Sequence, residues 1–161
     1  SNTTLRFLTI ENEGIESYYS GVIGTAPSFS IENVTVIASG QTEFGIWDSG
    51  YGNTSWPKLR NVTVLAAQYG IYSEYSSLSL VNVKVLSSGA NHAAVTLYRC
   101  SAKIFNLTAE GNVGVYITGT HIESEVSEIV NSQLTGSYHS LVNLRGSVTV
   151  DSTIFHGSVA Y

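Results

Sequence analysis

Four carboxylates lie near the most aromatic part of the sequence, where acid–base chemistry would be expected. They are Glu16, Glu43, Asp48 and Glu74. Acid–base catalysis requires two carboxyl groups that converge on one bond, or a base beside a cation. Glu43 and Glu74 fall in loops of successive repeat units and could approach each other, whereas Asp48 is expected to point inward and form hydrogen bonds at a corner. We therefore assign no catalytic residue.

Aromatic residues form a second candidate site, which suits carbohydrate. Trp47, Tyr72 and Tyr116 each follow a glycine–aliphatic pair, and Tyr75 and Tyr98 come just after the corresponding segments. A sugar ring can stack on solvent-facing aromatic rings of this kind. The alternative is an aromatic ladder that stiffens a sheet and binds nothing.

An alignment of six segments gives the direction of these side chains. The segments are Gly14-Ile15, Gly45-Ile46, Gly70-Ile71, Ala94-Val95, Gly114-Val115 and Ser140-Leu141. In a strand, successive side chains point to opposite faces, so the aliphatic residue is expected inside and the next residue outside. The outward residues are then Glu16, Trp47, Tyr72, Thr96, Tyr116 and Val142.

The aligned segments belong to a repeat that is clearest in a column of amides. This column, the candidate structural ladder, consists of Asn33, Asn61, Asn82, Asn106, Asn131 and Asp151. Neighbouring members are 28, 21, 24, 25 and 20 residues apart. Repeats of this length indicate a solenoid, in which each unit buries its apolar face only against its neighbours.

Each repeat unit contains short apolar runs that are typical of strands. In one unit they are residues 62–65, 69–72 and 78–81. The runs are rich in Val, Ile, Leu, Thr and Tyr and are bounded by Gly, Ser and Asn. No window combines a helical apolar period with helix caps. The outward column of the first run is expected to be Thr9, Thr35, Thr63, Lys84, Thr108, Gln133 and Thr153.

The amide column and the Gly-Ile-aromatic run resemble those of the right-handed parallel β-helix superfamily, which includes pectate lyases, polygalacturonases, phage tailspikes and bacterial surface proteins. The resemblance covers nearly the whole chain. It implies an all-β solenoid of about six to seven coils, each with three short strands, and an internal ladder of hydrogen-bonded asparagines. The motifs of the superfamily's enzymes (N-T-D, a D-D pair and G-H-G) do not occur in this sequence.

Several of these asparagines also fit the N-glycosylation pattern, which is the alternative interpretation of the column. Asn33, Asn61 and Asn106 each precede a residue and then a threonine, but Asn82 and Asn131 keep the column without this pattern. Glycosylation requires exposed asparagines, whereas an internal ladder requires buried ones.

Composition narrows the class of protein. Charged residues make up 12% of the 161 residues, about half of the usual share. With many Ser, Thr, Gly and Asn residues, this is typical of extracellular or cell-surface proteins. The net charge of −5 and the scattered Lys and Arg residues argue against nucleic acid as a partner. The apolar runs are too short for membrane insertion.

Residues 1–161 are expected to form a single domain, excised from a larger protein because the chain has no Met and no signal peptide. Cys100 is the only cysteine, and the four histidines are scattered, so we predict no metal site and no cofactor. Strand edges at uncapped ends would need cover from flanking segments or from self-association.

These features predict a non-catalytic extracellular β-helix module that acts as a rigid structural or binding surface. Weak contact with a glycan, neutral because the chain carries little charge, is expected through the outward aromatic residues. Two alternatives remain open. The chain could be a fragment of a polysaccharide lyase or glycoside hydrolase, or a trimeric β-helix of the tail-fibre type.

Overall fold

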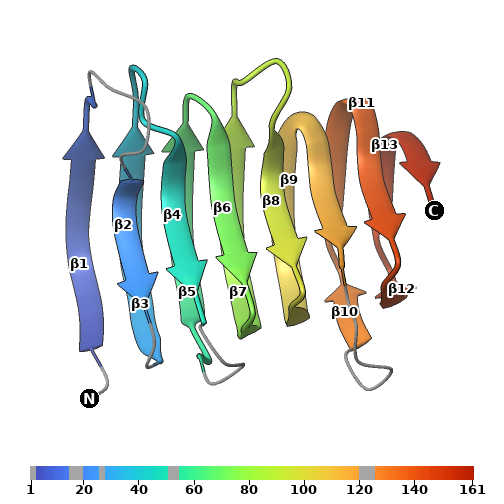
Figure 1. The fold of residues 1–161 in the computed structure, drawn as a ribbon, viewed down its shortest axis with the longest axis horizontal. Helices are drawn as coiled ribbons and strands as arrows, with labels where there is room; N and C mark the ends of the chain where they lie inside the picture. Colours follow the sequence, from blue (N-terminus) through green and yellow to red (C-terminus); the bar gives the residue numbers. More distant parts are fainter. Residues whose placement is uncertain (1–2, 15–19, 26–27, 51–54, 120–125) are drawn as a thin grey trace.

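A computed structural model describes residues 3–14, 20–25, 28–50, 55–119 and 126–161. They form a parallel β-solenoid of about six turns, and no helix occurs in the described part (Figure 1). Strands on the far side of Figure 1 run upward, strands on the near side run downward, and the chain advances from left to right, which is a right-handed path. The predicted all-β solenoid is therefore confirmed. None of the described residues belongs to a helix long and apolar enough to span a bilayer.

All strand pairs are parallel, and each strand pairs with its equivalent in the next coil. The strands are β1 (Thr3–Asn12), β2 (Ser20–Thr25), β3 (Phe29–Ala38), β4 (Phe44–Ser49), β5 (Lys58–Ala66), β6 (Tyr69–Glu74), β7 (Ser77–Ser87), β8 (Ala93–Tyr98), β9 (Ser101–Thr118), β10 (Val126–Val130), β11 (Gln133–Leu144), β12 (Ser147–Asp151) and β13 (Ile154–Ala160).

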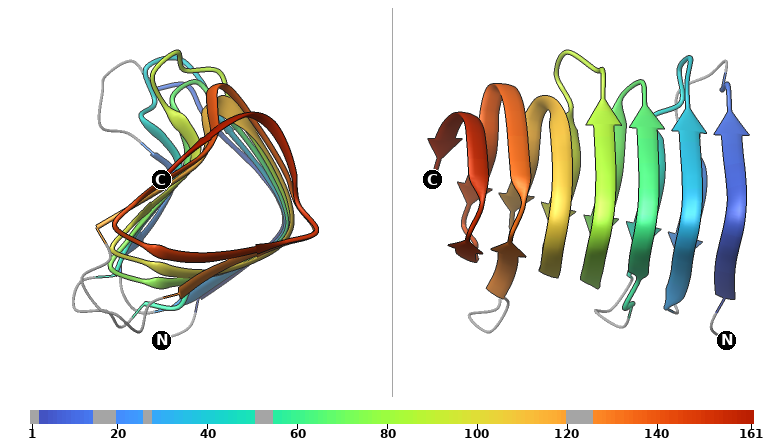
Figure 2. Two further views of the ribbon diagram at one scale, coloured as in Figure 1. Left: turned by 90° about the vertical axis from the view of Figure 1, so that its right-hand side faces the viewer. Right: turned by 180° about the vertical axis from the view of Figure 1, so that it is seen from behind.

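Seen end-on, the coils outline a rounded triangle whose sides we call faces A, B and C (Figure 2). In one coil, residues 58–60 lie on face A, residues 62–66 on face B, and β6 on face C. β1, β3, β5 and β7 each bend from face A to face B, and β9 continues around to face C.

The bend between faces A and B explains the amide column. Asn61 and Asn82 occupy this bend with φ of 52° and 54°, and the column's other asparagines are alike. Asparagine tolerates this left-handed conformation better than most residues because its short polar side chain can bond locally. The amides are linked along the axis, since Asn61 donates to Asn33, Asn82 to Asn61, and Asn106 to Asn82, at 2.9–3.0 Å.

The prediction that this ladder is internal is wrong, because these asparagines are exposed. Leu59 and Val62 on either side of the bend are both 1% exposed, while Arg60 and Asn61 between them both face solvent. The bend interrupts the in–out alternation of the strand, so two successive residues point outward. Asparagine therefore serves the backbone of the corner and does not fill the core.

The last member of the predicted column is off by one residue. Asp151 pairs with Val130, and Ser152 adopts the left-handed conformation with φ of 49°. The same shift places Ile154, not Thr153, beside Gln133 in the outward column of face B. In the first coil the bend falls on Phe7, with φ of 52°.

The predicted register of face C is confirmed from the second coil onward. Ile46, Ile71, Val95, Val115 and Leu141 stack in one inward column. In the first coil, Val22 pairs with Ile46 and Ile23 with Trp47, so the alignment of Gly14-Ile15 with this column is wrong. Glu16 lies outside the described residues. The position predicted for it belongs to Ile23.

Aliphatic columns from all faces fill the interior. Face A contributes Ile31, Leu59, Leu80, Ile104 and Ile129, all at most 2% exposed. The glycines of face C permit close packing against face B. A Cβ atom on Gly45 would lie 2.5 Å from Val64 Cγ1 and 2.6 Å from the Gly70 oxygen. The Gly-Ile-aromatic motif is therefore a packing requirement of the narrow solenoid.

Candidate ligand-binding face

The outer side of face C carries the predicted aromatic residues in one column. Trp47 pairs with Tyr72, Tyr72 with Thr96, and Thr96 with Tyr116, and Val142 follows. The three aromatic residues are half-buried, whereas Thr96 is only 6% exposed. The sequence therefore predicts correctly that these residues share one column. It does not predict how closely their rings cover the residues between them.

Phe44 and Tyr69 join this aromatic surface, although the sequence analysis did not assign them to it. The Phe44 ring lies 5.7 Å from Trp47, 5.3 Å from Tyr69 and 5.1 Å from Tyr72, between ring centroids. Strict alternation would place Phe44 on the same side as the buried Ile46. The strand departs from alternation at Gly45, which is buried beside Ile46, so Phe44 and Trp47 both reach the outer surface.

A cavity of about 420 Å³ lies beside the column, and we call it the tyrosine cavity. Its lining combines aromatic rings with hydroxyl and amide groups. The lining residues are Tyr69, Tyr72, Asn91, Ala93, Thr96, Tyr98, Val113, Tyr116 and Thr118. This lining resembles a small-molecule site, in which apolar and aromatic walls surround a few polar groups.

A second cavity, of about 260 Å³, lies on the other side of Tyr72. It is lined by Glu43, Phe44, Trp47, Tyr72 and Glu74, and we call it the acidic aromatic cavity. The structure thus brings Glu43 and Glu74 to one cavity, as the sequence suggested they could be. Tyr72 forms a wall of both cavities.

Some polar atoms on this face have no hydrogen-bond partner. They include Thr96 Oγ1, Trp47 Nε1 and His92 Nδ1, all shielded from solvent. A buried polar group without a partner costs about 1–3 kcal/mol. In native structures such groups are explained by strain, by a catalytic role, or by an ordered water or ion.

The hydroxyls of Tyr69 and Tyr72 stay protonated at neutral pH. Burial, and then the charge of Glu74, raise the pKa of Tyr72 to about 12. Burial and the charge of Glu43 raise the pKa of Tyr69 in the same direction. Both hydroxyls can therefore donate a hydrogen bond.

The remaining predicted ligand-binding residues, Tyr75 and Tyr98, form a separate group with Arg99. Their rings meet edge to face at 5.7 Å, and the guanidinium carbon of Arg99 lies 5.5 and 5.4 Å from their centroids. Arg99 Nη1 also donates to the Tyr75 hydroxyl at 3.1 Å. Tyr98 lines the tyrosine cavity, whereas Tyr75 lines neither cavity on this face.

Asp48 points inward, as predicted, and is 1% exposed. Ser55 donates to its Oδ1 atom at 3.1 Å and Ser73 to its Oδ2 atom at 2.9 Å. Burial raises the pKa of Asp48 despite these bonds, and burial likewise raises the pKa of the nearby Cys100 thiol. This cluster is closed to substrate. Within the described ranges, no three His, Cys, Asp or Glu residues converge to hold a metal ion.

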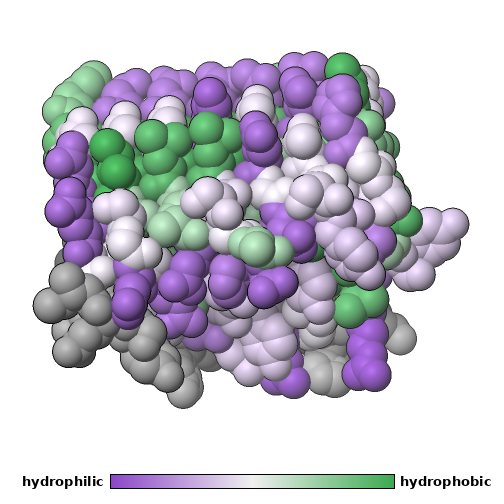
Figure 3. Space-filling model, turned by 90° about the horizontal axis from the view of Figure 1, so that it is seen from above, coloured by the Kyte–Doolittle hydropathy of each residue, from purple (hydrophilic) through white to green (hydrophobic). Residues whose placement is uncertain are grey.

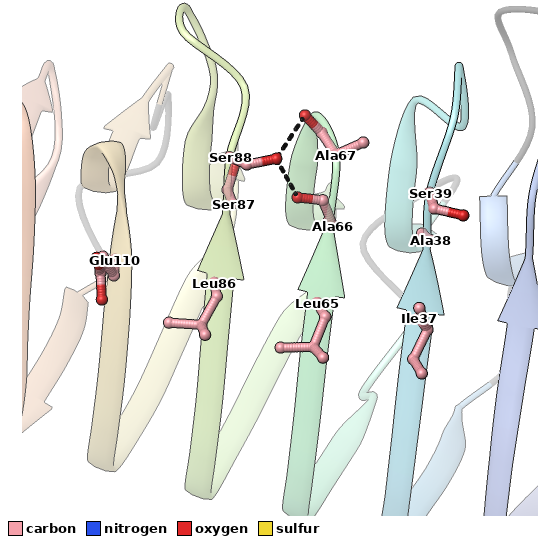
Figure 4. Close-up of a pocket in the computed structure, with 10 residues that line it drawn as sticks. All are labelled: Ile37, Ala38, Ser39, Leu65, Ala66, Ala67, Leu86, Ser87, Ser88 and Glu110. Atoms are coloured by element: carbon pink, nitrogen blue, oxygen red, sulfur yellow. Dashed lines mark hydrogen bonds between the residues drawn. The ribbon is translucent and has the colours of Figure 1, made fainter.

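Two further grooves lie on other sides of the solenoid. One, of about 400 Å³, follows an outward row of Ile37, Leu65 and Leu86 and ends at Glu110 (Figure 4). Figure 3 shows hydrophobic side chains in a short row with hydrophilic side chains around it. The other, of about 350 Å³, lies along the exposed amides of Asn61, Asn82 and Asn106. Neither groove combines aromatic rings with unsatisfied polar atoms.

Comparisons with known proteins add no relative, because no family model, curated protein or solved structure matches this chain.

Proposed function

We propose that this chain is an extracellular module of the right-handed parallel β-helix superfamily, a rigid surface that binds a neutral glycan weakly through face C. The observation that carries this proposal is the row of Trp47, Tyr72 and Tyr116 beside the tyrosine cavity. Solenoid rungs fix the positions of these rings in advance, so little conformational entropy is lost when a ligand binds.

The spacing of the rings suits an extended sugar chain. Rungs lie about 4.8 Å apart, which is close to the length of one sugar residue, so a glycan along the solenoid axis could meet successive rings. Each stacked ring contributes about 0.5–1.5 kcal/mol, so useful affinity requires several contacts at once. Around the rings, Asn91 and Thr118 offer partners for sugar hydroxyls.

Tryptophan fluorescence tests this proposal. The chain has two tryptophans, so replacing the exposed Trp56 with Phe leaves Trp47 as the only reporter. We expect neutral oligosaccharides to change Trp47 emission with a Kd of about 1 mM, and Tyr116→Ala to weaken binding about threefold to tenfold. Tyr138→Ala is the matched control, because Tyr138 is 68% exposed and lines neither cavity of face C. No response from a broad neutral panel would leave the row as reinforcement of the sheet.

Glycan hydrolysis is the second candidate, favoured by the two carboxylates that line the acidic aromatic cavity. Paired carboxylates are the catalytic groups of most glycoside hydrolases. Incubation with neutral and acidic polysaccharides, followed by a reducing-end assay, tests this candidate. Activity that Glu43→Gln or Glu74→Gln abolishes would establish it, and uniformly inactive protein would eliminate it.

A further inference from the structure

We infer that the acidic aromatic cavity binds an organic ammonium cation, and a quaternary ammonium group best. This inference goes beyond the proposed glycan binding and does not depend on it. It rests on the nature of the cavity walls, on the charge around them and on the size of the space.

The walls are aromatic rings held in place by one another. Phe44 and Trp47 are stacked, with 28° between their planes, and Phe44 meets Tyr72 at 58°. A cation is attracted to the face of an aromatic ring within about 6 Å, and tryptophan attracts it most strongly. Several rings around one space are the arrangement that recognises quaternary ammonium groups.

The two charged side chains in the lining of the cavity are both acidic. Glu43 and Glu74 both line it, and in the part of the chain that the structure describes neither forms a salt bridge. Arg99 lies over Tyr75 and Tyr98, outside this lining. The negative potential also reaches Tyr72, since Glu74 adds to the rise in its pKa. A cation in the cavity would therefore gain attraction from both carboxylates.

Size and hydration favour an alkylated ammonium group. The volume of about 260 Å³ is below the roughly 300–1,000 Å³ of pockets that hold a drug-sized ligand, so it suits a head group. A primary ammonium is strongly hydrated and needs hydrogen-bond acceptors when it leaves water. A quaternary group has no N–H to satisfy, so aromatic walls can replace its hydration more completely.

Choline and its neutral carbon isostere, in which a tert-butyl group replaces the trimethylammonium group, form the matched ligand pair. Both are titrated into the Trp56→Phe protein while Trp47 emission is recorded. We expect choline to bind about tenfold more tightly than the isostere, because only choline carries the charge. Glucosamine and lysine amide, which present primary ammonium groups, should bind more weakly than choline.

Variants show whether the acidic aromatic cavity is responsible. Glu43→Gln and Glu74→Gln should each weaken choline binding about threefold to tenfold. Glu128→Gln removes the same charge from β10, away from the cavity, and should leave binding unchanged.

Equal binding of choline and the isostere, or a Glu43→Gln/Glu74→Gln protein that binds choline normally, would overturn the inference. Primary ammonium ligands that bind more tightly than choline would overturn the quaternary preference. Titration of the same protein with neutral oligosaccharides reports separately on the glycan proposal.

Discussion

The side chain of Asn82 donates a hydrogen bond of 3.0 Å to the side-chain oxygen of Asn61, one coil earlier, and both residues have a positive φ. The two asparagines therefore serve the solenoid in two ways. Each adopts a backbone conformation that most side chains resist, and each links its coil to the next. Because both are exposed, this contribution does not come from burial.

Substitutions of Asn82 separate the two contributions. Asn82→Val loses the amide bonds to Asn61 and Asn106 and places a β-branched residue at a φ of 54°, so we expect a loss of about 2–3 kcal/mol in unfolding free energy. Asn82→Gly loses the same bonds but tolerates the backbone, so we expect a loss of about 1 kcal/mol. Urea unfolding of the two variants measures the difference. Equal losses would show that the conformation at this bend is not costly.

The first coil offers the opposite test, because Phe7 occupies the bend with φ of 52° and is 78% exposed. Phe7→Asn should stabilise the protein by about 1 kcal/mol, since asparagine relieves the strain and can bond to Asn33. Phe105→Asn is the matched control, because Phe105 is 48% exposed and directly precedes the bend residue Asn106, so it does not itself adopt the positive φ. The control should give no gain. A Phe7→Asn protein that melts below the wild type would contradict this explanation of the column.

The repeat made much of the fold predictable. Asparagines at Asn33, Asn61, Asn82, Asn106 and Asn131 fixed the coil register because each coil must make the same bend. The side on which they lie was not predictable from strand alternation, since the bend itself breaks the alternation. The period of the repeat and the direction in which its side chains point must therefore be predicted separately in such a sequence.

The register of the first and last coils was harder to predict from the sequence, because their residues satisfy the repeat pattern in more than one way. Gly14-Ile15 and Gly21-Val22 both fit the glycine–aliphatic motif, and the structure uses the second pair. Asp151 resembles the asparagines chemically, yet Ser152 makes the bend. Only neighbouring coils resolve such choices.

The column of aromatic residues at the candidate site was predictable from the sequence, but the two cavities beside it were not. Trp47, Tyr72 and Tyr116 share a register that follows from the repeat. The cavities depend on how Phe44 and Tyr69 pack against these rings, and ring packing is a property of the folded structure. Sequence period carries no information about it.

Core truncation should act locally along the solenoid. Ile71 is 1% exposed in the inward column of face C, so Ile71→Ala should cost about 2–5 kcal/mol. Each coil contacts mainly its neighbours, so hydrogen exchange should accelerate most in the adjoining coils. Leu65→Ala is the control, because Leu65 lines an open groove and its loss should cost clearly less. Uniform acceleration in every coil would contradict nearest-neighbour coupling.

The buried carboxyl of Asp48 should make stability depend on pH. Burial raises the pKa of Asp48 above its usual value of 3.8, and hydrogen bonds from serines, Ser73 among them, only partly oppose this. The folded state therefore holds its proton more tightly than the unfolded state does. This contribution to stability is fully present below the unfolded pKa and is lost as the pH rises through the folded pKa.

Asp48→Asn tests this pH dependence, because the amide has the same shape but does not ionise. Ser55 and Ser73 can each donate to or accept from the amide, so the hydrogen bonds can be kept. We expect the stability of the variant relative to the wild type to increase as the pH rises above the unfolded pKa, and to level off once the pH passes the raised folded pKa. Thermal melting of both proteins across this range measures the difference in their stability, and taking this difference cancels the contributions of other titrating groups.

A difference that stays constant with pH would mean that the Asp48 carboxyl titrates alike in the folded and unfolded states. The serine hydroxyls would then offset the cost of burying its charge.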